Sequence, residues 1–285
     1  MPRLIDVVQD AVIVAYREDV SPLQQTLSDG GFSVHVQRGQ YTGPELAFHA
    51  NFRCFMNHKA VWRRASQSSG WTLIMEADFV PCVGFHALPV PVPDTQTPGV
   101  KWAYLYVSAG KALWREGEFL RGHHVCPVCY LVTPTVARML LSFWDEETAK
   151  RGVGNYYPYD AHMQWSVMRQ GGEAYLPARS YGEHGGLPNP EHQARGVVSR
   201  SGVHRADVLA APLAFLPPYA RGSRWRYLQQ RAVARVLSLA RWVLGRWVIR
   251  PWPPRARGDL RLYWLGLKRH LCNEPALPVK ERHVG

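Results

Sequence analysis

The stretch Trp71-Thr-Leu-Ile-Met-Glu-Ala-Asp78 decides the fold of this chain. Residues 71–75 form a short apolar run, which predicts a buried β-strand, and the carboxylates of Glu76 and Asp78 follow directly at its C-terminal end. Ligands of open α/β sheets bind at the carboxyl ends of strands, so we expect the two acids to hold a hard divalent cation, Mn²⁺ or Mg²⁺. The simpler alternative is a pair of solvated acids that end the strand.

Strand-like and helix-like segments alternate on both sides of this stretch. Short apolar runs predict strands, and apolar residues at helical spacing predict helices. The predicted strands are 11–16, 32–37, 101–107 and 128–133, and the predicted helices are 21–29, 48–66, 134–143 and 160–169. This alternation predicts an α/β domain whose mostly parallel sheet is flanked by helices.

The positive charge of the chain is concentrated at its C-terminal end. Residues 221–285 hold 15 Lys and Arg and 3 Asp and Glu, so their net charge is 15 − 3 = +12, which equals that of the whole chain. We therefore expect a neutral main domain over 1–220 and a basic helical tail over 221–285, whose partner should be anionic. No window has the length and apolar character of a signal core or a membrane span, and we expect a cytoplasmic protein.

The tail begins with a predicted amphipathic helix, residues 223–250. Its arginines gather in one sector and its apolar residues on a broad neighbouring face. The arginines are Arg224, Arg231, Arg235 and Arg246, and the apolar residues are Trp225, Val233, Val236, Ala240, Val243, Leu244 and Trp247. Such helices lie in membrane interfaces, so we expect contact with an anionic membrane surface. The alternative is a helix docked on the body with its arginines in water. A second segment of similar composition covers 260–271.

Polar residues elsewhere in the main domain supply further candidates. Asp160 precedes a predicted helix, so it is either a general base for an acceptor hydroxyl or an ordinary N-cap. His184 lies beside Glu183 in a glycine-rich loop, which is either a metal or phosphate site or a plain surface loop. Tyr157 is either a residue that stacks on a sugar or base or a part of the core, and Arg205 either contacts a phosphate or lies in a solvated turn.

Residues 51–80, NFRCFMNHKAVWRRASQSSGWTLIMEADFV, resemble the core of glycosyltransferase family 25, the lipooligosaccharide and collagen galactosyltransferase group. That family has a Cys, a Ser-His pair and a Trp in one helix, followed by a strand that ends in Glu-Asp-Asp. Here Cys54, Asn57-His58 and Trp62 come in that order. Asn57 stands where Ser is usual, and Ala77 stands where the middle Asp is usual, which leaves one possible metal ligand fewer.

The resemblance implies a GT-A fold, a nucleotide-sugar donor such as a UDP-hexose, and transfer to a glycan or lipid-linked glycan, as in lipopolysaccharide biosynthesis. In this interpretation Mn²⁺ or Mg²⁺ is bound by Glu76, Asp78 and His184, and Asp160 is the catalytic base. The predicted substrate-binding residues are His58, Glu183, Tyr157 and Arg205. We then expect a peripheral enzyme on the inner face of the membrane. The alternative is a nucleic-acid-associated binding protein that uses the Arg/Trp-rich tail, although the neutral body contains no recognisable nucleic-acid motif.

Overall fold

The computed structural model describes residues 1–96, 99–116, 119–186, 205–247 and 257–271. An eight-stranded sheet in the order β2-β1-β3-β8-β5-β9-β7-β6 forms the centre of this part of the chain. Its strands are β1 (Val8–Ala15), β2 (Val34–Arg38), β3 (Trp71–Glu76), β5 (Lys101–Tyr104), β6 (Lys111–Glu116), β7 (Phe119–His123), β8 (Cys129–Val132) and β9 (Glu173–Leu176). Only β7 and β8 run against the other described strands of this sheet, because each is antiparallel to both of its neighbours. The predicted α/β fold with a mostly parallel sheet is confirmed.

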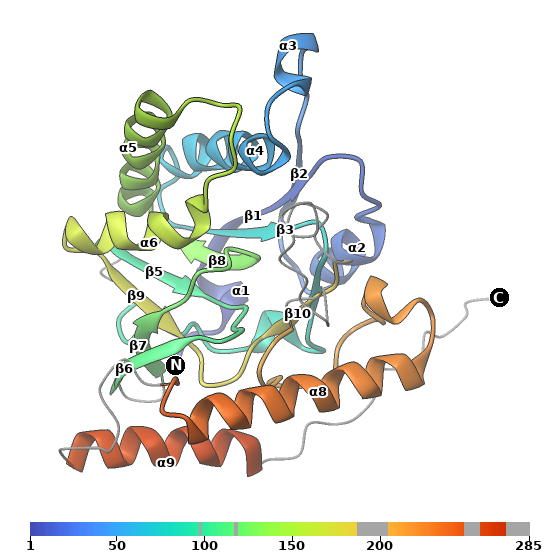
Figure 1. The fold of residues 1–285 in the computed structure, drawn as a ribbon, viewed down its shortest axis with the longest axis vertical. Coiled ribbons are helices and arrows are strands. Elements are labelled where there is room, and N and C mark those ends of the chain that lie inside the picture. Colours follow the sequence, from blue (N-terminus) through green and yellow to red (C-terminus); the bar gives the residue numbers. More distant parts are fainter. Residues whose placement is uncertain (97–98, 117–118, 187–204, 248–256, 272–285) are drawn as a thin grey trace.

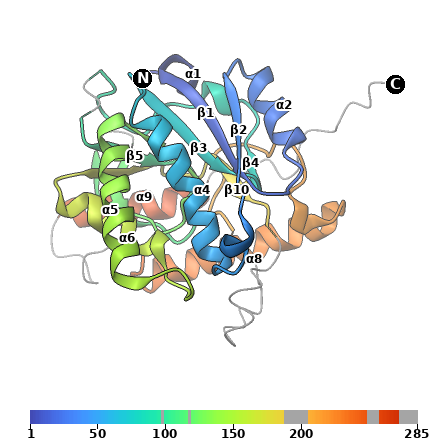
Figure 2. The ribbon, with the colours of Figure 1, turned by 90° about the horizontal axis from the view of Figure 1, so that it is seen from above.

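Helices cover both faces of this sheet (Figures 1 and 2). One face carries α4 (Ala50–Ala65), α5 (Pro134–Arg151) and α6 (Tyr159–Arg169), and the other carries α1 (Leu4–Val7), α2 (Ser21–Asp29) and the short helix η1 (Phe85–Ala87). Successive residues of a strand point to opposite faces, so Ile13 lies in the core under α2 while Val12 and Val14 lie in the core under α4. A strand buried on both faces needs the continuous apolar run that predicted β1.

The predicted elements differ from the observed ones mainly in their ends. The helix predicted over 48–66 is α4, where the His49 side chain accepts a hydrogen bond from the Asn51 backbone N–H at the N-terminus. The helix predicted over 134–143 continues to Arg151 as α5. The hairpin of β6 and β7 was not predicted, because its apolar and charged residues do not alternate regularly. The short helix α3 (Gly43–Leu46) follows β2.

A second, two-stranded sheet lies beside the C-terminal end of β3. It pairs β4 (Phe79–Pro81) with β10 (Gly182–His184) in antiparallel register, so that His184 lies opposite Phe79. The glycine-rich segment predicted to be a loop is therefore a strand over 182–184, and its residues 187–200 lie outside the described part of the chain. This pairing brings a segment about a hundred residues further along the chain to the turn that holds Asp78.

The basic tail forms two helices that lie side by side along one edge of the molecule (Figure 1). Ser223 caps α8 (Arg224–Val243) by accepting a hydrogen bond from the Arg226 backbone N–H, and α9 (Arg257–Leu271) confirms the second predicted segment. The short helix η2 (Pro218–Ala220) precedes α8. The first predicted helix, 223–250, thus ends earlier than expected, since residues 244–247 form a turn, and residues 248–250 lie outside the described residues.

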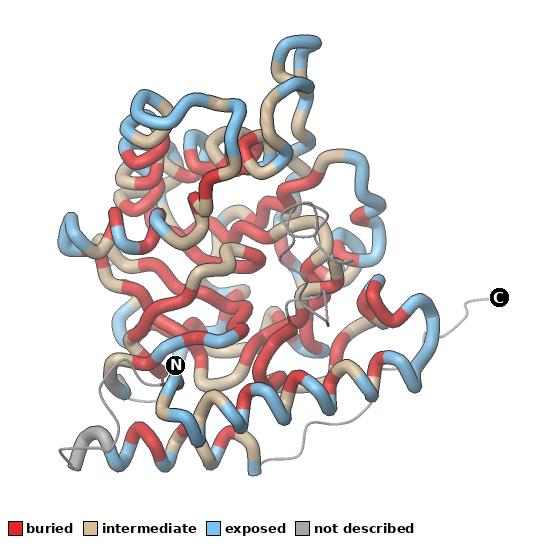
Figure 3. The backbone as a smooth tube through the Cα atoms, viewed as in Figure 1, coloured by how far each residue is buried: buried red, intermediate tan, exposed pale blue. Residues whose placement is uncertain are grey.

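The structure separates the arginines of the predicted sector, because Arg224 and Arg246 are exposed while Arg231 is buried, and it also buries Trp247 of the predicted apolar face. The side that faces the body carries Tyr227, Arg231, Ala234 and Ser238, all of them buried. Exposed residues repeat along the opposite side of the helix (Figure 3). The expectation of a docked helix with its arginines in water is therefore wrong for Arg231, which is only 4% exposed. Within the described ranges, none of the helices has the length and apolar character that crossing a membrane requires.

Candidate functional site

The three predicted metal ligands lie together at the C-terminal end of β3. Glu76 is the last residue of that strand, Asp78 lies in the following turn, and His184 ends β10. One ligand atom from each of the three side chains lies within 4.8 Å of the others, and the His184 Nε2 atom is 3.2 Å from the Asp78 Oδ2 atom. Two carboxylates and an imidazole form a donor set that Mn²⁺ accepts, so these residues fit the predicted ion.

Two glycines let the chain pass close to Asp78. The Gly185 backbone N–H donates a 2.7 Å hydrogen bond to the Asp78 backbone carbonyl. A Cβ atom on Gly186 would collide with the Asp78 carboxylate and with the His184 imidazole, and one on Gly185 would collide with the Asp78 carbonyl. This glycine pair therefore lets the backbone approach Asp78 itself.

Electrostatic effects of opposite sign act on Asp78. Burial raises the pKa of this carboxyl, the nearby His184 lowers it, and the negative charge of Glu76 raises it again. Two acids that share one site repel each other, and a divalent cation between them removes that repulsion. Both carboxylates keep about a quarter of their side-chain surface exposed, with 25% for Glu76 and 27% for Asp78, so a ligand can reach them.

Two buried hydrogen bonds position His58 beside Glu76. The Trp62 indole N–H donates to the Tyr130 hydroxyl at 2.9 Å, and the Tyr130 hydroxyl lies 3.0 Å from His58 Nδ1. The His58 Nε2 atom lies 3.4 Å from the Glu76 carboxylate. Because an ionised carboxylate only accepts, this contact assigns a proton to Nε2 and leaves Nδ1 to accept from the Tyr130 hydroxyl.

These hydrogen bonds explain why a His and a Trp in α4 occur together with the acids after β3. His58 is only 2% exposed, so it contacts Glu76 and not a substrate in the open part of the site. Cys54, His58 and Glu76 form a second group of possible metal ligands, in which one atom of each lies within 4.8 Å of the others.

A cavity of about 280 Å³ opens at the same end of the sheet. The carboxylates lie at its edge, and its walls come from the end of β1 and from α4. Its lining residues are Val14, Ala15, Tyr16, Glu18, Tyr41, Ala50, Arg53, Cys54, Asn57, Glu76, Ala77 and Asp78. A cavity that joins acids, aromatic rings and an arginine suits a ligand with a phosphate part and a ring part.

Sequence reasoning missed the aromatic and cationic residues of this cavity. The rings of Tyr16 and Tyr41 lie 5.2 Å apart, and the Arg53 guanidinium lies 5.6 Å from the centre of the Tyr41 ring. The Asn57 amide N–H donates to the Ala15 carbonyl at 2.7 Å, which fixes the end of β1 beside α4. The available signal was the position of Tyr16 at the C-terminal end of the predicted strand 11–16, and the structure pairs this strand with β3.

Asp160 is the second residue of α6, and Pro158 occupies the capping position. The N-cap alternative for Asp160 is therefore wrong. Burial raises the pKa of the Cys126 thiol, and the charges of Asp160 and then Glu76 raise it further. Asp160 is partly buried and is not among the residues that line the cavity beside Glu76.

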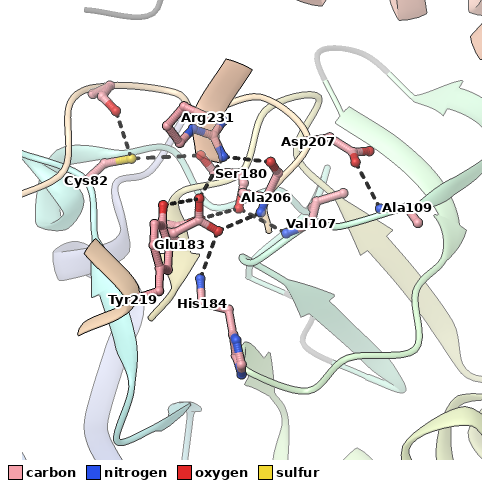
Figure 4. Close-up of polar contacts among 12 residues, drawn as sticks. Cys82, Val107, Ala109, Ser180, Glu183, His184, Ala206, Asp207, Tyr219 and Arg231 are labelled. Atoms are coloured by element: carbon pink, nitrogen blue, oxygen red, sulfur yellow. Dashed lines mark hydrogen bonds and ion pairs between the residues drawn. The ribbon is translucent and has the colours of Figure 1, made fainter. Parts of the chain in front are cut away.

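Three predicted substrate-binding residues lie away from this cavity. Glu183 is fully buried and contacts Arg231, and its side chain leaves β10 on the side opposite His184 (Figure 4). Arg205 is buried near Glu183 and Tyr219. Tyr157 lies under the Arg151 guanidinium, which is 3.9 Å from its ring centre.

No family model matches the sequence, and no curated protein sequence matches it. The resemblance to glycosyltransferase family 25 thus stays a prediction. Solved structures that resemble part of the chain include a glycosyltransferase involved in the glycosylation of the major capsid of the virus PBCV-1. It is 11% identical over 59% of this chain and 80% of its own, with a TM-score of 0.37.

A second similar structure is a mutant of the Drosophila β-1,4-galactosyltransferase 7 in complex with manganese, UDP-Gal and xylobiose. It is 14% identical over 60% of this chain, with a TM-score of 0.35, and the match spans 65% of the galactosyltransferase, less than two thirds of its length. Likeness at these values does not establish a common family, and the function is inferred below from the residues of the site.

Proposed function

We propose that this chain is a metal-dependent glycosyltransferase with a GT-A-like fold. It transfers a hexose from a nucleotide-sugar donor, such as a UDP-hexose, to a hydroxyl of a glycan or lipid-linked glycan. The observation that carries the proposal is the cavity that joins Glu76 and Asp78 to Tyr16 and Tyr41. Acids at one end suit a cation that binds a diphosphate, and the aromatic rings suit the base of the nucleotide.

Glu76, Asp78 and His184 would hold the Mn²⁺ or Mg²⁺ ion. When bound, the ion offsets the charge that develops on the departing diphosphate. Hydrogen bonds from Trp62 to Tyr130 and between Tyr130 and His58 fix the His58 imidazole, whose Nε2 atom lies 3.4 Å from the Glu76 carboxylate and favours one orientation of it. The guanidinium of Arg53, in the wall of the same cavity, attracts the donor phosphates.

In the transfer step, the bond between the anomeric carbon and the diphosphate oxygen breaks and a bond to the acceptor oxygen forms. Asp160 takes the proton of the acceptor hydroxyl, and the nucleoside diphosphate leaves with its electron pair. This role rests on the sequence position of Asp160 in the first turn of α6, since Asp160 does not itself line the cavity.

The arginines of the tail favour this proposal over nucleic-acid binding. Arg231 is paired with Glu183, and both Arg241 and Arg269 are paired with Asp207. Cations that already neutralise buried acids are not available to a phosphate backbone. This leaves fewer of the tail charges for the electrostatic contact on which non-specific nucleic-acid binding depends.

A donor screen tests the proposed function directly. Release of nucleotide is followed from UDP-, GDP- and CMP-sugars, with a mixture of glycan acceptors, in the presence of Mn²⁺ and in the presence of a chelator. We expect release from one donor class that needs the ion and is lost in the Asp78→Asn variant. Release from none of the donors, or release that the variant retains in full, would overturn the proposal.

A further inference from the structure

From residue 232 to its end at Val243, the exposed residues of α8 are all apolar, whereas Arg226 and Gln229 interrupt the outward face nearer the N-terminus. Its exposed large apolar residues, with exposed fractions, are Trp225 82%, Val233 38%, Val236 67%, Leu237 47%, Leu239 40% and Val243 60%, and Leu244 follows at 63%. Scattered apolar side chains are normal on a protein surface, but a continuous row along one helix marks a contact surface.

Buried ion pairs fix the rotation of the helix and keep this face outward. On the inner side, the Arg231 guanidinium lies 2.6 Å from the Glu183 carboxylate and donates to the Ala206 carbonyl at 2.8 Å. A rotation that turned the apolar row inward would withdraw Arg231 and leave the buried Glu183 carboxylate without its cation, which is strongly unfavourable. The exposed row is therefore a stable property of the fold.

Helix α9 extends the apolar surface and stays attached to α8. The Trp242 indole N–H donates to the Tyr263 carbonyl at 2.9 Å, and Arg235 donates to the His270 carbonyl. On α9 the exposed large apolar residues are Leu260 at 58%, Trp264 at 59% and Leu271 at 64%. Tryptophan is the residue that favours the headgroup level of a membrane.

The charge around this surface decides which partner fits it. Residues 221–247 contain seven arginines and no acid, and Arg224, Arg226 and Arg246 are exposed. A two-fold contact with a second copy of this chain would place these arginines against one another, which repels. An anionic bilayer offers both an apolar interior for the row and negative charge for its rim.

We propose that α8 lies in the interface of an anionic membrane, such as the cytoplasmic leaflet, with its row of Val236, Leu237, Val243 and Leu244 turned into the lipid. The exposed arginines contact lipid phosphates at the rim, and α9 adds Trp264. The docked arginines on the other side of the helix hold the body to the membrane in one orientation. This inference does not rest on the proposed transfer reaction, because it uses no residue of the donor site.

The test is co-sedimentation of the full chain with vesicles of phosphatidylcholine alone or mixed with phosphatidylglycerol. Leu237→Ser and Leu46→Ser form a matched pair, because the two leucines are 47% and 48% exposed and Leu46 lies in α3 at the far end of the molecule (Figure 1). We expect the wild type and Leu46→Ser to bind the mixed vesicles alike. Leu237→Ser should bind roughly tenfold more weakly, as withdrawal of one leucine from lipid predicts.

Charge and association controls complete the experiment. Arg224→Gln with Arg226→Gln should weaken binding further, and binding by the wild type should fall with added salt. Equal binding by the two leucine variants, or equal binding to the neutral vesicles, would overturn the proposal. So would a dimer in light scattering that Leu237→Ser dissociates without any vesicle binding. The assay contains neither donor nor metal, so its failure leaves the transferase proposal untouched.

Discussion

Arg231 and Glu183 form a buried ion pair with 2.6 Å between the guanidinium nitrogen and the carboxylate oxygen. The pair joins the tail helix α8 to β10, the strand that carries the proposed metal ligand His184. The Glu183 carboxylate also accepts hydrogen bonds from the backbone N–H groups of Ala206 and His184. Burial raises the pKa of Glu183, while Arg231 and these backbone donors lower it. The tail therefore supports the site as well as covering the body.

Removal of Arg231 should destabilise the whole fold. We expect Arg231→Met to lower the free energy of unfolding by about 3–5 kcal/mol, because it leaves a buried carboxylate without its cation. Urea denaturation measures the loss, with the exposed Arg224→Met as the control that should change little. The double variant Arg231→Met with Glu183→Leu should recover much of the stability, since replacing both charges removes the unpaired one. A loss in Arg231→Met no larger than in the control would show that the pair is not structural.

Asp78→Asn should abolish Mn²⁺-dependent binding of the nucleotide sugar and leave the fold intact. The substitution keeps the shape of the side chain but removes a charge that a hard cation requires. Isothermal titration calorimetry with and without Mn²⁺ measures the binding, and Asp145→Asn is a control because Asp145 is 74% exposed on α5. Binding that remains unchanged in Asp78→Asn would remove this residue from the proposed site.

Asp160→Asn should slow turnover by about 10² or more while donor binding is retained, if the carboxylate takes the acceptor proton. Stability should change little, because Pro158 and not Asp160 is at the N-cap. The measurements are kcat with a saturating acceptor and the donor Kd from calorimetry. A normal kcat, or a fall in kcat matched by loss of the folded state, would count against a role as base.

Tyr130→Phe should weaken Mn²⁺ binding by roughly tenfold, the scale at which groups behind a metal ligand act. The change removes the hydroxyl that links Trp62 to His58, so His58 no longer holds its proton toward Glu76. Tyr104→Phe is the matched control, since Tyr104 is also a fully buried tyrosine, on the neighbouring strand β5. Equal Mn²⁺ affinity in the two variants would show that the hydrogen bonds of the Tyr130 hydroxyl do not support the site.

The fold should lose stability in mild acid because His124 is buried as the neutral imidazole. Burial, the largest cause, lowers its pKa to about 4, and its Nδ1 atom accepts a hydrogen bond from the Cys126 backbone N–H. The unfolded chain binds the proton near pH 6.5, so this stability is complete above about pH 6.5 and is lost as the pH falls toward about 4.

At pH 5 the loss from His124 should be about 2 kcal/mol relative to pH 7, at about 1.4 kcal/mol per pH unit. Urea denaturation at both pH values checks this. The variant His124→Gln should show about half of the wild-type loss, since the neighbouring His123 also has its pKa lowered to about 4, chiefly by burial. An undiminished loss in the variant would assign the pH dependence to other groups.

Local patterns predicted much of the fold and one part of the site. The apolar run 71–75 and the two acids after it predicted a strand that ends in carboxylates, because both features lie within one short segment. The cavity walls could not be predicted in the same way, since Tyr16 and Tyr41 meet Glu76 only when β1 is known to pair with β3. The glycines beside His184 made it a candidate ligand, but the pairing of its strand β10 with β4 was not predicted.

The orientation of α8 shows why periodicity alone was misleading. A helical pattern separates arginines from apolar residues and leads one to expect the arginines in water. Here the deciding group is Glu183, which lies 48 residues before Arg231 in the chain and is buried where no surface pattern reveals it. This buried acid on the body draws Arg231 inward, although Arg224 and Arg246 of the same predicted sector stay exposed.

The two cores on opposite faces of the sheet share a dependence on the last described helices. Tyr227 belongs to the core under α2, while Trp247, Leu262 and Tyr263 belong to the core under α4. During synthesis the chain leaves the ribosome from its N-terminal end, so one core stays incomplete until Tyr227 has emerged and the other until Tyr263 has emerged. The ion pairs of Glu183 and Asp207 likewise wait for the arginines of the tail. The strand β10, which carries His184 beside Glu183, therefore gains its full set of buried partners only late in synthesis.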